Sequence, residues 1–160
     1  MMRIALVSLV TLALMTAGGC ARPEFETDTA SNIAEADGLK VLIDLPGRQL
    51  TTGQTLRVEV TATNTTGKDI SIHSPTGAPV VVRVLRHTML TREIVRVYPG
   101  SATANILSWT LPAGQSRTFV LVVPVEPDWP VSEVLHVSAE LNGYGQVAPA
   151  VAVVVKAPKK

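Results

Sequence analysis

Hydrophobic and polar residues alternate along most of the chain beyond its first quarter. In the clearest stretch, the even-numbered residues from Leu56 to Ala62 are apolar, and the odd-numbered residues from Arg57 to Thr63 are polar. Side chains on a β-strand point to opposite faces in turn, so this period of two predicts a strand with one buried face. The Asn-Thr-Thr-Gly-Lys segment that follows is typical of a turn, because Asn and Gly adopt the backbone conformations that turns require.

Similar segments at regular spacing predict nine strands, at residues 39–45, 56–63, 69–74, 79–87, 93–98, 105–111, 116–123, 134–141 and 147–156. Both faces of the 116–123 segment are largely apolar, so we expect this strand to be covered on both sides. Asn142-Gly143 is expected to form a tight hairpin turn between the last two strands. No segment after residue 38 has the apolar stripe of an amphipathic helix.

Short strands with turn residues between them are typical of an antiparallel β-sandwich, immunoglobulin-like in the broad sense. An up-and-down or Greek-key barrel is the alternative arrangement of such strands. The composition agrees with an all-β fold, since the chain has 23 Val among its 160 residues. Apolar residues make up 46% of the chain and charged residues 17%, which excludes a largely disordered protein.

The charge balance of the chain bears on its partners. There are 14 Lys and Arg against 13 Asp and Glu, a formal net charge of +1. Nucleic-acid binding draws its affinity from clustered cations that contact phosphates. The balance therefore predicts no nucleic-acid partner. The length suits one domain of ordinary size rather than two.

Residues 1–19 have the three-part layout of a secretory signal peptide. Arg3 gives a basic start, an apolar run follows, and small residues lead to Cys20. The apolar run is shorter than the roughly 20 residues that a membrane-spanning helix needs, so we interpret it as a leader. The segment Ala17-Gly18-Gly19-Cys20 resembles the lipobox at which bacterial lipoprotein precursors are modified and cut.

That resemblance implies cleavage between Gly19 and Cys20 and a lipid-modified cysteine that holds the mature protein on a membrane. Cys20 is the only cysteine of the chain, so the resemblance also accounts for a thiol that cannot form an internal disulfide. Ala21 is not the Asp that the family's sorting rules link to the inner membrane, which favours the outer membrane. The alternative is an ordinary signal peptide in which the cysteine occurs by chance.

Composition divides the remaining chain into three parts. Residues 20–38 combine several acids with little apolar content, so we expect a flexible tether that lifts the domain off the membrane. Residues 39–157 form the predicted sandwich domain. Residues 158–160 form a short basic tail.

Three segments of the domain resemble the BsuPI family of immunoglobulin-like domains, which is named for an intracellular proteinase inhibitor. They are the alternating strand that ends at Asn64–Lys68, a two-strand unit that ends near Tyr98-Pro99, and the turn and strand from Trp109 to Phe119. The resemblance implies an immunoglobulin-like fold and suggests proteinase inhibition as an activity. No individual inhibitory residue can be transferred from the family to this chain.

Few patterns in the sequence indicate catalysis. Ser116 lacks the second glycine of a nucleophile elbow, and the three histidines do not have the spacing of a zinc site, so we predict no metal and no cofactor. Glu126 and Asp128 precede Trp129 in a Pro-rich loop, and a glycosidase could use such a pair of acids beside an aromatic residue. The interpretation that we favour is a connecting loop in which Trp129 covers an edge of the core.

The leading prediction is a non-enzymatic, lipid-anchored module that binds a protein or an envelope component. Free sheet edges that can accept a partner strand favour it, as do loops 124–131 and 142–146, because function on sandwiches commonly lies on loops. The candidate contact residues are Glu126, Asp128, Trp129, Asn142 and Tyr144. The alternatives are an extracytoplasmic proteinase inhibitor and, less favoured, a small hydrolase that uses the two acids.

Overall fold

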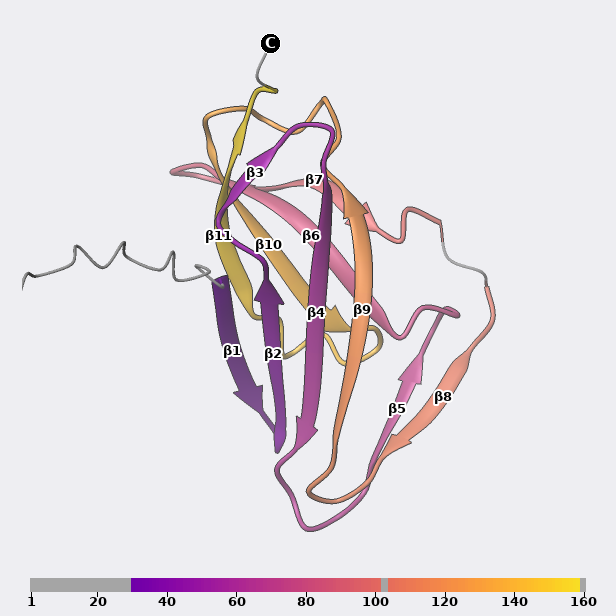
Figure 1. Cartoon of the computed structure of the whole chain (residues 1–160). Coiled ribbons are helices and arrows are strands. Elements are labelled where there is room, and N and C mark those ends of the chain that lie inside the picture. Colours follow the sequence, from indigo (N-terminus) through magenta and orange to yellow (C-terminus); the bar gives the residue numbers. More distant parts are fainter. Residues whose placement is uncertain (1–29, 102–103, 159–160) are drawn as a thin grey trace, which may run out of the picture.

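The computed structural model describes residues 30–101 and 104–158 of the chain (Figure 1). These residues form eleven strands: β1 (Ala30–Ala36), β2 (Leu39–Leu45), β3 (Gln49–Thr51), β4 (Thr55–Asn64), β5 (Ile70–Ser74), β6 (Val80–His87), β7 (Arg92–Tyr98), β8 (Leu107–Leu111), β9 (Ser116–Pro124), β10 (Val134–Leu141) and β11 (Ala150–Lys156). The nine predicted strands are all present, with small shifts at their ends. The structure adds β1 and β3, which the alternation of residues does not predict.

The strands form two large sheets that lie face to face (Figure 1). The first sheet has the strand order β1-β2-β4-β9, and the second has the order β3-β11-β10-β6-β7. Strands β5 and β8 pair separately and extend from the lower end of the sandwich as a two-stranded ribbon. All pairs are antiparallel except β3 with β11, which is parallel.

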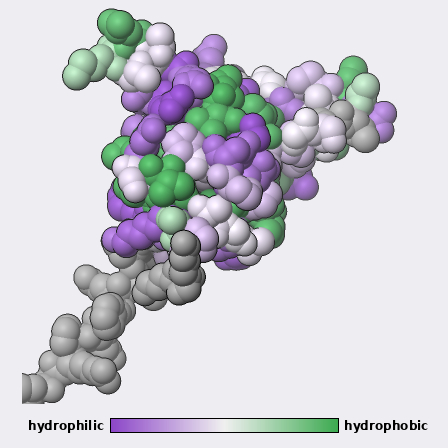
Figure 2. Space-filling model, turned by 90° about the horizontal axis from the view of Figure 1, so that it is seen from above, coloured by the Kyte–Doolittle hydropathy of each residue, from purple (hydrophilic) through white to green (hydrophobic). Residues whose placement is uncertain are grey.

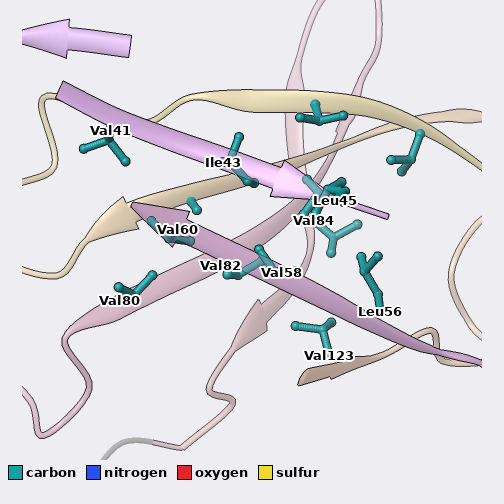
Figure 3. Packing of buried hydrophobic residues seen from close by; sticks show 14 of the residues in the cluster. Val41, Ile43, Leu45, Leu56, Val58, Val60, Val80, Val82, Val84 and Val123 are labelled. Atoms are coloured by element: carbon teal, nitrogen blue, oxygen red, sulfur yellow. The ribbon is translucent and has the colours of Figure 1, made fainter. Parts of the chain in front are cut away.

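The core lies between the two large sheets, on the faces where the alternation places apolar residues. Leu56, Val58 and Val60 of β4 and Val82 and Val84 of β6 are fully buried members of one cluster (Figure 3). Burial of each such side chain contributes about 1.5–3 kcal/mol. The predicted antiparallel, immunoglobulin-like sandwich is confirmed, and the barrel is excluded because each large sheet has two edge strands.

The prediction of a flexible tether is wrong for residues 30–38, because these residues form β1 and its turn to β2. Each residue of β1 pairs with a residue of β2, and Ala30 is fully buried. Asp37 and Gly38 join the strands with positive φ angles of 51° and 75°, the combination that a two-residue primed turn requires. The sequence signal was therefore present as an Asp-Gly pair, although the acidic composition of the segment outweighed it. The described part of the domain begins at Ala30, and residues 20–29 of the predicted tether lie outside the described residues.

The connection between β10 and β11 also differs from the prediction. The ladder ends at the pair Ser138–Ala150, so a long loop replaces the tight hairpin expected at Asn142-Gly143. Gly143 has φ 90°, whereas Asn142 does not have a positive φ, so the pair does not form the primed turn. A Cβ atom at Gly143 would collide with the backbone carbonyl of His73, and this close approach holds the loop against β5.

Candidate functional site

The loop that follows β9 is held on β7 by a cluster of charged and polar side chains. Arg96 Nε donates a hydrogen bond to Glu126 Oε2 at 2.9 Å, and the same guanidinium forms an ion pair with Asp128. The Tyr98 hydroxyl donates to Glu126 Oε1 at 3.0 Å. Both acids that the sequence singled out therefore lie around one arginine.

These contacts determine how Glu126 titrates. The hydrogen bond from Arg96, followed by that from Tyr98, holds the pKa of the Glu126 carboxyl below its ordinary value. A glycosidase acid needs the opposite, a raised pKa that keeps its proton near neutral pH. Burial raises the pKa of the Tyr98 hydroxyl above its ordinary value, so this group remains a hydrogen-bond donor. The geometry suits a loop anchor better than an acid catalyst.

The structure contradicts the prediction that Trp129 of this loop contacts a partner. Its side chain is 1% exposed and lies 6.4 Å from the Tyr98 ring, centroid to centroid. It packs in the core, as the favoured alternative interpretation proposed. A side chain this deeply buried cannot take part in a contact surface, because the loop would first have to leave the sandwich.

The second predicted contact loop is also tied to the domain by its own side chains. Asn142 Nδ2 donates hydrogen bonds to Thr76 Oγ1 at 2.7 Å and to the Ala78 carbonyl at 3.0 Å. Tyr144 is half-buried against the core. This loop follows β10 at the lower end of the sandwich, whereas the loop at 124–131 follows β9 at the upper end (Figure 1). The structure does not bring the two predicted contact loops together.

The histidines fall at two places. The rings of His87 and His136 stack with their centroids 4.3 Å apart, and burial, followed by the nearby His87 and Arg92, lowers the pKa of His136. His73 Nδ1 lies 3.0 Å from Ser108 Oγ. Among residues 30–101 and 104–158, no group of three or more His, Cys, Asp or Glu side chains is placed to hold a metal ion.

Within the same described residues, no helix has the length and hydropathy needed to cross a membrane.

A different surface emerges at the open edge of the sandwich, along β9. A hollow of about 250 Å³ lies beside this strand, and its lining is almost entirely apolar: Ala78, Pro79, Val80, Pro99, Phe119, Val120 and Leu121. On the outer face of β9, Val120 is 49% exposed and Val122 is 67% exposed. The expectation that both faces of this strand are covered is therefore wrong for the described residues. Seen from above, apolar residues also reach the surface in separate patches (Figure 2).

Among the residues that the structure describes, no strand pairs with β9 on the side away from β4. At the two ends of the strand, the carbonyls of Gln115 and Val125 accept hydrogen bonds from the β4 side at 2.9 and 2.8 Å. Backbone groups in an antiparallel ladder point alternately toward one neighbour and away from it, so the odd-numbered residues of β9 bond to β4. The N–H and C=O groups of Thr118, Val120 and Val122 consequently face the open side.

One cation lies at the lower end of this edge. The Arg117 guanidinium lies 5.0 Å from the centroid of the Trp109 ring and 5.3 Å from that of Phe119. The two rings meet edge to face with centroids 5.4 Å apart. Among the residues that the structure describes, no carboxylate lies within ion-pairing distance of Arg117. The β9 edge, defined here as residues 117–122 with the adjacent hollow, therefore combines a free backbone, an apolar surface and an accessible positive charge.

Comparison with known proteins gives evidence on the fold. No protein-family model and no curated protein matches the sequence. Among solved structures, the sporulation control protein Spo0M from Bacillus subtilis matches with a TM-score of 0.51 and 14% identity, over 77% of this chain and 51% of that chain. A β-glucosidase from Listeria innocua in complex with gluconolactone matches with a TM-score of 0.44 and 15% identity, over 82% of this chain and 16% of that chain. The chain thus spans about half the length of Spo0M, and that likeness supports the β-sandwich fold.

Proposed function

We propose that this protein is a lipid-anchored, non-enzymatic lipoprotein of the bacterial cell envelope, whose sandwich domain binds another protein. The resemblance of residues 17–20 to a lipobox supports the anchor. The observation that carries the binding function is the β9 edge, where apolar side chains and unpaired backbone groups lie together. Native sheet proteins normally protect such edges, so an unprotected one favours a partner.

The proposed anchor has a simple energetic basis. Each CH₂ group buried in a bilayer contributes about 0.8 kcal/mol, and a single myristoyl chain holds a protein only marginally. The diacylglyceryl group and N-linked chain of a bacterial lipoprotein would together make release negligible. Because residues 30–36 form β1, at most residues 21–29 separate Cys20 from the described part of the domain, fewer than the sequence alone predicts. The binding surface would then be held close to the membrane.

The geometry of the acidic residues supports the non-enzymatic part of the proposal. Glu126 and Asp128 share the Arg96 guanidinium, and the pKa of Glu126 is lowered. A proton donor for hydrolysis would need the reverse environment. The contacts of both acids with Arg96 hold the loop on β7.

The anchor is tested by the substitution Cys20→Ser. We expect this variant to lose labelling by a radioactive fatty acid and to move from the membrane fraction to the soluble fraction, because the acyl chains are attached at the sulfur. The substitution Ser31→Ala, on the exposed face of β1, is the control and should leave both properties unchanged. Membrane fractionation that persists in Cys20→Ser would contradict the proposal.

The binding function is tested by crosslinking in intact cells followed by mass spectrometry of the full-length protein. We expect a reproducible protein partner whose crosslinks fall on the β9 edge, rather than on the outer face of β1. Failure to find any partner under several growth conditions would overturn the binding half of the proposal and leave the anchor intact.

A second candidate function is proteinase inhibition outside the cytoplasm, favoured by the resemblance of Trp109–Phe119 to the BsuPI family. An inhibitor should slow a secreted serine proteinase at stoichiometric amounts of the purified chain. A binding module without this activity should leave the proteinase unaffected.

A further inference from the structure

We propose that the β9 edge binds its partner as an added β-strand, and that the segment it selects has apolar residues at alternate positions and an acidic residue that contacts Arg117. This inference names the chemistry of the partner and rests on the proposed binding function. Strand addition uses the backbone for affinity and pockets along the edge for specificity. The β9 edge supplies both, as the following observations show.

The first observation is that β9 lacks the devices that protect β7 and β1, two of the other edge strands. β7, one edge of the second sheet, carries Arg92, Glu93 and Arg96, and its pairing with β6 has a register shift. β1, the opposite edge of the first sheet, is tied to β11 by a hydrogen bond from Asn32 Nδ2 to the Ala150 carbonyl at 2.7 Å. Charges, irregular pairing and cover by another segment all discourage edge pairing. From Thr118 to Val123, β9 has no charge and no proline, and its pairing with β4 is regular.

The second observation concerns the backbone. Thr118, Val120 and Val122 present N–H and C=O groups outward at alternate positions, which is the pattern that an incoming strand needs. At the upper end, Pro124 has no N–H to donate, and the Tyr98 hydroxyl, which is shared with Glu126, lies 3.2 Å from the Pro124 carbonyl oxygen. The pairing is therefore limited to the part of the strand below Pro124. An added strand would cover Val120 and Val122 on the outer face with its own side chains.

The third observation defines the side chains of the partner. Arg117, Phe119 and Leu121 lie on the same face of β9, at a spacing of two residues. Residues directly opposite one another in a sheet have Cβ atoms about 4.5–5.5 Å apart, so a partner strand must match this spacing. Apolar side chains suit the hollow beside Phe119 and Leu121, which has a volume of about 250 Å³. A carboxylate suits Arg117, which has aromatic rings beside it and no acidic neighbour among the described residues.

Charge favours a segment of another protein over a second copy of this chain. β9 itself contains no acidic residue, so two paired copies of this strand would offer no carboxylate to Arg117. Glu126, two residues beyond the strand, is already bound to Arg96. A segment that matches the β9 edge must therefore carry both apolar and acidic residues, and a second copy of β9 has no acidic residue.

The test uses the purified full-length protein in detergent and three fluorescein-labelled ten-residue peptides. The first has valine at two alternate positions, threonine between them, and aspartate at the next alternate position. The second replaces the aspartate with lysine, and the third replaces both valines with serine. By fluorescence anisotropy we expect the first peptide to bind roughly five- to tenfold more tightly than the second, because an exposed ion pair is lost and a like-charge repulsion replaces it. The third should bind more weakly than the first.

Two variants of the protein separate the side-chain and backbone contributions. Arg117→Glu should reverse the preference, so that the lysine peptide binds more tightly than the aspartate peptide, whereas Arg92→Glu, an equal charge change on β7, should not. Val120→Pro removes an outward N–H and leaves the ladder to β4 intact, because proline is tolerated where the N–H of an edge strand faces solvent. It should abolish binding of all three peptides while an unchanged circular dichroism spectrum shows that the fold is kept.

The remaining outcomes overturn the inference. Equal affinity for the three peptides, no binding at about 1 mM peptide, or a preference that Arg117→Glu does not change would each do so. If the protein binds no peptide but self-associates, and Val120→Pro abolishes this self-association, the β9 edge binds a second copy of the chain instead. If no peptide binds and a cellular partner crosslinks elsewhere on the domain, this inference is contradicted but the proposed binding function is not.

Discussion

Arg96 and Gly143 hold the two connecting loops of this protein, and each acts through a different force. Arg96 fastens the upper loop electrostatically, by binding Glu126 and Asp128. Gly143 fastens the lower loop sterically, because only a residue without a Cβ atom can lie so close to the His73 carbonyl. The sequence predicts a contact surface at both loops, since polar and aromatic residues in a loop look the same whether they face a partner or the domain.

The first residue-scale prediction concerns the pH dependence of stability. The pKa of Glu126 is lower in the folded protein than its ordinary value of 4.5. Ionised Glu126 therefore stabilises the fold above that value, and the contribution is lost as pH falls through the folded pKa. The difference in unfolding free energy between the natural protein and Glu126→Gln should be present at pH 7 and shrink below about pH 4.5, as measured by urea denaturation. A difference of equal size at both pH values would contradict this assignment.

The second residue-scale prediction concerns Gly143. Gly143→Ala should lower the unfolding free energy by about 1–3 kcal/mol, because it combines an unfavourable φ with a clash against the His73 carbonyl. Gly53→Ala is the matched control, since Gly53 has a similar φ of 87° but open space around its Cα. Chemical denaturation should show a smaller loss for Gly53→Ala. Equal losses would mean that φ alone matters and that the lower loop is not packed as described.

Among the elements, β1 shows how composition can conceal a strand. Its burial pattern is weakly alternating, and it contributes alanine rather than valine to the core, so its apolar signal is small. The Asp37-Gly38 turn is the stronger signal, because this pair favours the primed turn of a hairpin. Strands with valine on alternate positions, such as β4 and β11, were predictable from the sequence for the opposite reason.

The location of β1 gives a prediction at the element scale. Ala30→Asp should lower the unfolding free energy by about 2–4 kcal/mol, because it places a charge on a fully buried position. Ser31→Asp, on the exposed face of the same strand, should change it by less than about 0.5 kcal/mol. Both can be measured by thermal or chemical unfolding of the full-length protein. If Ala30→Asp were as mild as its control, residues 30–36 would behave as the tether that composition suggests.

For the whole molecule, alternation predicted the strands and the layered architecture but not the order of strands within each sheet. The period of two shows which face of a strand is buried, and it contains no information on which strand lies beside it. The β9 edge could not be predicted for this reason, because Phe119, Val120 and Leu121 resemble the residues of a strand covered on both faces. Only the topology shows that β9 has a neighbour on one side.

The position of β11 has a consequence for how the protein is made. β11 is the last strand along the chain, yet it lies inside the second sheet, between β3 and β10. A growing polypeptide cannot complete this sheet until residue 156 has left the ribosome, and such distant pairings form slowly. If the chain is exported as proposed, this delay would keep it unfolded while it passes through a translocation channel. The sandwich would then fold only after the chain has crossed the membrane.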